Sequence, residues 1–141
     1  MSVNYFLDTN ILVYTFDDSS PEKRDHAREI VRDALGGGTG AISSQVVQEF
    51  INVATRKFTV PMTASEAALY LQRVLVPLCQ VWTDERDYQD ALRLMEITRY
   101  AWFDSLILGA AIRVGATELL SEDFHHGQVV EGVRIRNPFR S

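Results

Sequence analysis

Hydrophobic and polar positions along the chain form blocks that predict strands followed by helices. The first block, VNYFLDTNILVYTF at residues 3–16, opens with an apolar run rich in β-branched and aromatic residues. Such a run predicts a strand that is buried on both faces. The run breaks at Asp8, Thr9 and Asn10 and then resumes. A carboxylate between two buried segments must be paired, hydrogen-bonded or bound to a metal, because an isolated buried charge is costly.

Later blocks continue the alternation of strand and helix. Ser20 and Pro21 predict the start of a helix that ends at the glycines 36–38. The segment TASE at 63–66 has the pattern of a capping box and opens a helix that we expect to end at Val76, before Pro77. Short apolar runs predict further strands at 40–44, 79–83, 117–123 and 133–139. Helical spacing predicts the other helices at 45–57, 85–98 and 102–115.

This alternation predicts an α/β fold with a parallel sheet, right-handed crossovers and helices on both faces. Ligands of such folds bind beyond the carboxyl ends of the strands. The chain of 141 residues has no internal repeat and no linker long enough to separate domains. We therefore expect a single domain over residues 1–141.

Composition narrows the classes of partner. The chain has 14 Lys and Arg against 19 Asp and Glu, a net charge of -5, which argues against binding nucleic acid by charge alone. Such a balance suits a basic partner or an acidic cluster neutralised by metal. The single cysteine, Cys79, cannot form an internal disulfide. No apolar run reaches the ~20 residues that span a membrane, and no signal-peptide pattern is found, so we expect a cytoplasmic protein without a membrane partner.

Four acidic residues are expected at one edge of the sheet. Asp8 ends the first predicted strand, and Asp123 follows the fourth. Glu49 lies one turn into the helix after the second strand, at the border of that helix's apolar face. Asp104 lies in the first turn of a later helix, on its apolar face. The acids come from four segments, and the fold would bring them together.

Crowded carboxylates repel one another, which raises their pKa values and costs stability unless a cation lies among them. Oxygen ligands without clustered Cys or His favour Mg²⁺ or Mn²⁺ over zinc. Such an ion activates water and stabilises charge on a phosphate, which is the chemistry of phosphodiester cleavage. Two alternatives remain open. Asp8 and Asn10 could only bond their own backbone in an Asx-type turn. Asp104 could be an N-cap, or could satisfy the free N–H groups of its helix.

Four short motifs, in order and with the usual spacing, resemble the conserved blocks of PIN domains. They are FLDTN, SQVVQEF, WFDSLIL and LLSEDF. The chain is most similar to the VapC-type toxins of bacterial toxin–antitoxin pairs. This resemblance implies a PIN-like three-layer α/β/α fold with a central parallel sheet ordered 3-2-1-4-5. It also implies a Mg²⁺- or Mn²⁺-dependent endoribonuclease that forms a homodimer and is inhibited by a cognate antitoxin.

The resemblance also assigns roles to the acids. Asp8 and Asp104 match the main metal ligands of the family. Asp123 matches a fourth acid that binds metal directly or through water. Glu49 matches an acid that orients the attacking water or a second ion. Hydrolysis by metal-activated water would leave a 5′-phosphate and a 3′-hydroxyl.

Other positions have supporting roles by the same resemblance. Asn10 corresponds to the polar residue that supports the first Asp, and Ser121 to the hydroxyl before the last acid. Glu122 stands beside Asp123, so either acid could turn inward, although strand alternation favours Asp123. Arg56 and Lys57 are candidates to hold RNA phosphate, but basic residues at the end of a helix also complement its dipole.

Two other function classes compete with the ribonuclease. An aspartyl-nucleophile phosphatase would carry Asp-x-Asp after the first strand, but Asn10 occupies the third position here. A catalytically silent scaffold would use the acidic groove only to hold a basic partner. Metal-dependent cleavage of RNA distinguishes the ribonuclease from both.

Overall fold

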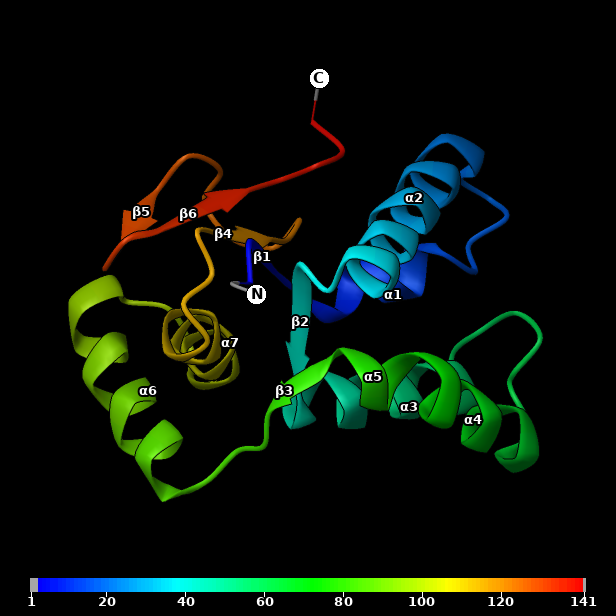
Figure 1. The fold of residues 1–141 in the computed structure, drawn as a ribbon, viewed down its shortest axis with the longest axis horizontal. Coiled ribbons are helices and arrows are strands. Elements are labelled where there is room, and N and C mark those ends of the chain that lie inside the picture. The colour runs from blue at the N-terminus through cyan, green and yellow to red at the C-terminus, as the bar shows by residue number, and fades with distance from the viewer. Residues whose placement is uncertain (1–2, 141) are drawn as a thin grey trace.

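The computed structural model describes residues 3–140, which contain a six-stranded sheet in the order β3-β2-β1-β4-β6-β5 (Figure 1). The strands are β1 (Tyr5–Leu7), β2 (Gly40–Ser43), β3 (Cys79–Val81), β4 (Glu118–Leu120), β5 (Val129–Val130) and β6 (Val133–Arg136). All neighbours pair in parallel except β5 and β6, which are antiparallel. The first four positions follow the expected order 3-2-1-4-5, but the full order differs slightly, because β6 lies next to β4 and β5 lies outside it. The edge strand β5 is an addition that the sequence did not predict.

Helices cover both faces of this sheet. They are α1 (Thr9–Tyr14), α2 (Pro21–Gly37), α3 (Ser44–Arg56), α4 (Ala64–Tyr70), the π-helical turn η1 (Leu71–Leu75), α5 (Val76–Leu78), α6 (Glu85–Thr98) and α7 (Trp102–Arg113). Helix α2 packs against β2 from one side, whereas α7 packs against β2 and β4 from the other, with α6 against α7 (Figure 1). The three-layer α/β/α architecture is confirmed.

One local element was not predicted, and one local expectation was wrong. The apolar residues after Asn10 form the short helix α1, although their β-branched and aromatic side chains do not favour a helix. The helix that begins with the capping box of Thr63 and Glu66 does not end before Pro77. It passes through the π turn and continues as α5, with Pro77 near the start of that last segment. Proline is tolerated in the first turn of a helical segment, because it has no N–H and the N–H groups of that turn need no partner within the segment.

Two central strands anchor the carboxyl edge of the sheet. Phe6 and Leu7 of β1 and Leu119 of β4 are fully buried, and Leu120 is 1% exposed. Helix α2 approaches β2 so closely that a Cβ on Gly40 would lie 2.4 Å from the Cβ of Ala34. Only glycine fits at this position. These contacts fix the residues that follow β1 and β4.

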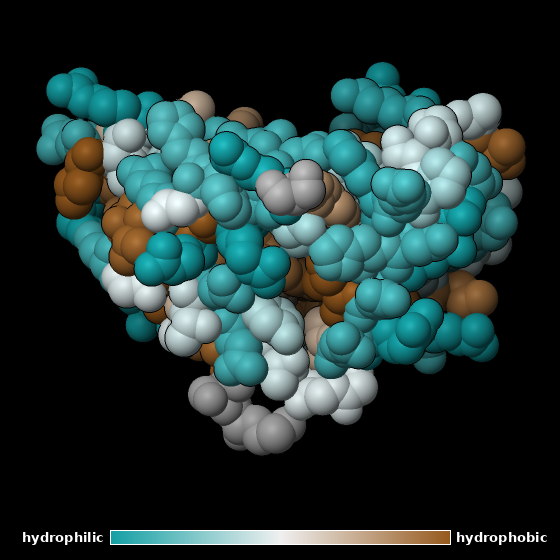
Figure 2. Space-filling model, turned by 90° about the horizontal axis from the view of Figure 1, so that it is seen from above, coloured by the Kyte–Doolittle hydropathy of each residue, from teal (hydrophilic) through white to brown (hydrophobic). Residues whose placement is uncertain are grey.

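An aromatic cluster joins the α1–α2 connection to α3 and α4. Phe50 stacks on Tyr70 with ring centroids 4.7 Å apart, and Phe16 lies 5.3 Å from Phe58. Seen from above, the surface is mostly hydrophilic, with hydrophobic side chains showing in patches between the polar ones (Figure 2). Within the described residues, no helix has the length and apolar character needed to cross a membrane.

Candidate metal centre

Asp8 lies directly after β1 and is 6% exposed. Its Oδ1 accepts a hydrogen bond from the Thr9 N–H at 2.7 Å, and its Oδ2 accepts one from the Ser121 hydroxyl at 2.6 Å. Burial raises the pKa of Asp8 to about 7, with smaller upward contributions from Asp123 and Glu49 and downward ones from the two hydrogen bonds. Asp8 therefore does bond to its local backbone, but to the next residue and not two residues on as in an Asx-type turn, and this bond occupies only one of the two carboxylate oxygens.

Glu49 is a half-buried side chain of α3 that faces the segment after β1. The Thr9 hydroxyl donates to Glu49 Oε1 at 2.6 Å. The Gln45 amide donates to Glu49 Oε2 at 3.0 Å. Helix α3 begins at the carboxyl end of β2, where the Ser43 side chain accepts a hydrogen bond from the backbone of Val46. The strand end thus places Glu49, and two neutral donors orient its carboxylate.

Asp104 is a half-buried residue in the first turn of α7. Ala101 occupies the N-cap position, so the N-cap alternative for Asp104 is wrong. Burial raises the pKa of Asp104, and Asp123 and Glu49 raise it further. Among the hydrogen bonds of residues 3–140, none reaches the Asp104 carboxylate. This acid is therefore close to other negative charges without a donor that would stabilise its ionised form.

Asp123 follows β4 and is linked through Asn10 to the segment that follows β1. The Asn10 amide nitrogen donates to Asp123 Oδ2 at 3.0 Å. The Ser121 hydroxyl accepts the Asp123 backbone N–H at 3.0 Å. The Asn10 Oδ1 is buried and has no hydrogen-bond partner. Asn10 therefore bonds to Asp123 and not, as expected, to Asp8, and its own oxygen is unsatisfied, whereas Ser121 contacts both Asp8 and the Asp123 backbone.

Glu122 points to a different set of partners. Its Oε1 accepts from the Tyr14 hydroxyl at 2.6 Å, and its Oε2 pairs with the Lys23 ammonium at 2.7 Å. Burial raises the pKa of Glu122, but the bonds from Lys23 and Tyr14 lower it more, so that the net shift is downward. Glu122 is held by α1 and α2, whereas Asp123 is the acid that meets Asn10.

The oxygen donors of the four acids suit a hard divalent cation, although their carboxylates lie apart from one another. Within residues 3–140, no group of three or more His, Cys, Asp and Glu side chains is gathered closely enough to hold a metal ion. The ion pairs of the described residues also leave out all four acids. The raised pKa values of Asp8 and Asp104 and the unsatisfied Asn10 oxygen all favour an added positive charge. The site therefore fits Mg²⁺ or Mn²⁺ by its chemistry.

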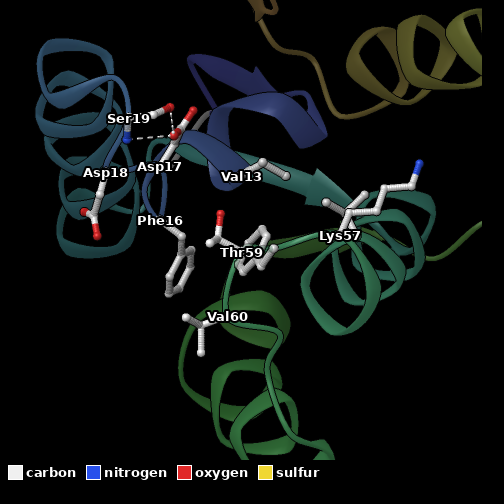
Figure 3. A pocket seen from close by; sticks show the side chains of 10 residues that line it. Val13, Phe16, Asp17, Asp18, Ser19, Lys57, Thr59 and Val60 are labelled. Carbon is white, nitrogen blue, oxygen red and sulfur yellow. Dashed lines mark hydrogen bonds between the residues drawn. The ribbon is translucent and has the colours of Figure 1, made fainter.

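Arg56 and Lys57 lie at the end of α3 and are exposed. Lys57 lines a cavity of about 550 Å³ that lies between the α1–α2 connection and the segment after α3 (Figure 3). Phe16, Asp17 and Val60 also line it, and none of the four acids does. The role of the basic pair in holding RNA stays a prediction.

Thr9 and Gln45 were missed by the sequence reasoning, although both touch Glu49. Thr9 stands inside the FLDTN motif, and Gln45 lies one helical turn before Glu49 in SQVVQEF. The spacing of four residues places Gln45 and Glu49 on the same side of a helix. That spacing was the available clue for Gln45, whereas the contact between Thr9 and α3 depends on tertiary structure.

The fold and the site together define a class, namely a three-layer α/β protein with acidic residues from four segments near the carboxyl edge of its sheet. The sequence model of the PIN domain matches residues 5–131. The chain therefore belongs to the PIN domain family.

Solved structures of VapC toxins have the same fold. The DNA-bound VapBC complex of Salmonella typhimurium matches with a TM-score of 0.67 and 22% identity, covering 96% of this chain and 98% of that one. VapBC2 of Rickettsia felis, bound to a fragment of promoter DNA, matches with a TM-score of 0.66, 20% identity and the same coverage. VapC20 of Mycobacterium tuberculosis, a toxin that cleaves the sarcin–ricin loop, matches with a TM-score of 0.60 and 14% identity, covering 85% and 92%. No curated protein sequence matches the chain.

Proposed function

We propose that this protein is a metal-dependent endoribonuclease and the toxin of a type II toxin–antitoxin pair. The observation that carries the proposal is the placement of Asp8, Glu49, Asp104 and Asp123 around the carboxyl edge of a PIN-domain sheet. Burial and mutual repulsion raise the pKa of Asp8 to about 7 and shift that of Asp104 upward as well. Acids in such surroundings are typical of functional sites.

In this proposal Asp8, Asp104 and Asp123 would hold Mg²⁺ or Mn²⁺ after their carboxylates move closer together than they lie in this structure, and Ser121 and Asn10 would orient two of these ligands. The bound ion would stabilise charge on the scissile phosphate and lower the pKa of water. Glu49 would orient the attacking water or a second ion. As the water oxygen bonds to phosphorus, its proton would pass to Glu49, the P–O3′ bond would break, and the 3′ oxygen would leave as a hydroxyl with a proton from solvent. A carboxylate offers about four lone-pair positions, and Thr9 and Gln45 occupy two of those on Glu49. Lone pairs therefore remain free on both Glu49 oxygens.

The proposed partners follow from the neighbours and from charge. The structural neighbours are VapBC complexes and a toxin that cleaves the sarcin–ricin loop. We therefore assign an RNA substrate and a cognate antitoxin to this chain. Its net charge of -5 favours a partner with a basic segment. A homodimer is carried over from the family resemblance, and light scattering after size-exclusion chromatography measures it.

The experiment that tests the function is cleavage of total tRNA and of a structured RNA by the purified protein. Mg²⁺, Mn²⁺ and EDTA are compared for the wild type, Asp8→Asn and Asp104→Asn. Asp33→Asn is the matched control, because Asp33 is an exposed acid on α2. We expect metal-dependent cleavage by the wild type and the control only, with 5′-phosphate ends.

Other outcomes would reject parts of the proposal. Products with 2′,3′-cyclic phosphate would mean that the RNA 2′-hydroxyl attacked, which excludes hydrolysis by activated water. Equal cleavage by all variants and in EDTA would place the activity outside the acids. Mn²⁺ binding without cleavage of either RNA would favour the binding scaffold instead.

A further inference from the structure

Gln45 joins the two helices that carry Glu49 and Asp104. It lies in the first turn of α3 and is 8% exposed. Its Nε2 donates to Glu49 Oε2 at 3.0 Å and to the backbone oxygen of Phe103 at 3.0 Å. Phe103 immediately precedes Asp104 in the first turn of α7. One amide group, using both of its hydrogens, therefore contacts an acid on α3 and the backbone beside an acid on α7.

Thr9 holds Glu49 from the opposite end of the carboxylate. Its hydroxyl donates to Glu49 Oε1 at 2.6 Å, and its backbone N–H donates to Asp8 Oδ1 at 2.7 Å. A continuous run of hydrogen bonds thus extends from Asp8 through Thr9 and Glu49 to Gln45. The run ends at Phe103, next to Asp104.

We infer that Gln45 is a positioning residue, which sets the Glu49 carboxylate and the start of α7 relative to each other for ion binding. The inference rests on the proposed function and deepens it. A buried amide stabilises the fold little compared with an apolar side chain of the same size, because its desolvation offsets most of the hydrogen-bond energy. What the amide adds is direction, since its two hydrogens point to two fixed acceptors. Groups that orient metal ligands in this way change metal affinity by about 10- to 100-fold when they are removed.

The chain offers a matched pair of substitutions on one helix. Gln45→Met keeps the length of the side chain and removes both donors. Gln48→Met makes the same change at an exposed position of α3 and serves as the control. Thr9→Val removes the other donor to Glu49, whereas Thr9→Ser keeps the hydroxyl.

The first measurement is Mn²⁺ affinity by calorimetry, in the wild-type and Glu49→Ala backgrounds. We expect Gln45→Met to weaken Mn²⁺ binding about 10-fold in the wild type and less than twofold after Glu49→Ala. Gln48→Met is expected to change neither value, and Thr9→Ser to bind at least fivefold more tightly than Thr9→Val. An equal loss from Gln45→Met in both backgrounds would overturn the inference, because Gln45 would then act on the fold as a whole.

The second measurement needs neither metal nor RNA. In ¹⁵N spectra of the metal-free protein, we expect the Gln45 side-chain amide to exchange with solvent at least 10-fold more slowly than that of Gln48. Glu49→Ala should reduce this protection. Unchanged exchange at Gln45 in Glu49→Ala would reject the contact and with it the inference. If both measurements give the expected results but the protein cuts no RNA, the proposed ribonuclease function is rejected and the positioning role of Gln45 stands.

Discussion

The Ser121 hydroxyl donates a hydrogen bond of 2.6 Å to Asp8, across a sequence separation of 113 residues. The same oxygen accepts the Asp123 N–H at 3.0 Å and lies 3.4 Å from the Asn10 amide nitrogen. A single fully buried hydroxyl therefore links the segment after β1 to the segment after β4.

Removing this hydroxyl should harm both the fold and the acidic site. We expect Ser121→Ala to lower the free energy of unfolding by about 1–3 kcal/mol, because the buried Asp8 carboxylate and the partly buried Asp123 N–H lose their partner. Urea denaturation measures this change. Ser44→Ala is the control, since Ser44 is also buried but bonds to Thr83 and to none of the acids. If RNA cleavage falls equally in both variants, Ser121 has no particular role at the site.

The buried carboxyl of Asp8 predicts an unusual dependence of stability on pH. Its pKa is about 7 in the folded protein against an ordinary value of 3.8, so between these values only the folded state keeps the proton. The metal-free wild type should therefore lose stability as pH rises from 5 to 7, by roughly 2–3 kcal/mol from this group. Asp8→Asn lacks the group and should not show this loss.

Urea denaturation in EDTA at pH 5, 6, 7 and 8 measures the difference between the two proteins. We expect Asp8→Asn to gain stability relative to the wild type up to about pH 7 and to level off above it. Asp33→Asn controls for the loss of one negative charge at an exposed position. A constant difference between wild type and Asp8→Asn at all four pH values would show that Asp8 titrates normally.

Loss of the charge at the two neighbouring acids, Glu122 and Asp123, should affect RNA cleavage differently. Asp123→Asn is expected to lower the rate of RNA cleavage at least 100-fold, because Asp123 is a proposed ion ligand. Glu122→Gln should leave that rate within about threefold and lower the melting temperature slightly, since a partly exposed ion pair such as Lys23–Glu122 contributes little. Cleavage assays and thermal melts of both variants decide the point. If Glu122→Gln lost cleavage and Asp123→Asn did not, the assignment of Asp123 to the site would be wrong, and Glu122 would take its place.

The basic pair at the end of α3 is expected to act on RNA binding and not on the chemical step. Arg56→Ala and Lys57→Ala should each raise KM about 3- to 10-fold with kcat unchanged, and should reduce the dependence of KM on salt. Arg32→Ala, at an exposed position of α2, is the control. Cleavage kinetics at several salt concentrations provide the measurement. An unchanged KM in both variants would remove the pair from the RNA-binding surface.

Local patterns were enough to predict much of the fold. The helix at 85–98 has the bounds expected from its apolar spacing, and the capping box of Thr63 and Glu66 forms as expected. The elements that local patterns did not predict are those whose form depends on tertiary packing. Helix α1 is short and built from residues that favour strands, so its form depends on packing against α2 and α3. The two residues of β5 exist as a strand only because β6 lies beside them.

The site shows the same division. Strand ends were enough to place Asp8 and Asp123 at one edge of the sheet, because parallel strands end together there. The orientation of Glu122 depends on Lys23 and Tyr14, which lie 99 and 108 residues away in sequence. A single sequence does not show which residues so far apart along the chain come into contact. The bonds that orient the acids therefore had to come from the structure.

The parallel pairing of β1 with β4 has a consequence for the order of events during synthesis. Tyr5–Leu7 pairs with residues 118–120, so the central strand gains this neighbour only after residue 120 has left the ribosome. Contacts between such distant segments form late, since the intervening chain must first be closed into a loop. Asp8 and Asp123 therefore stay apart until the segment after residue 118 has been made. A protein with the proposed toxic activity would be harmless as a nascent chain until that segment joins the sheet.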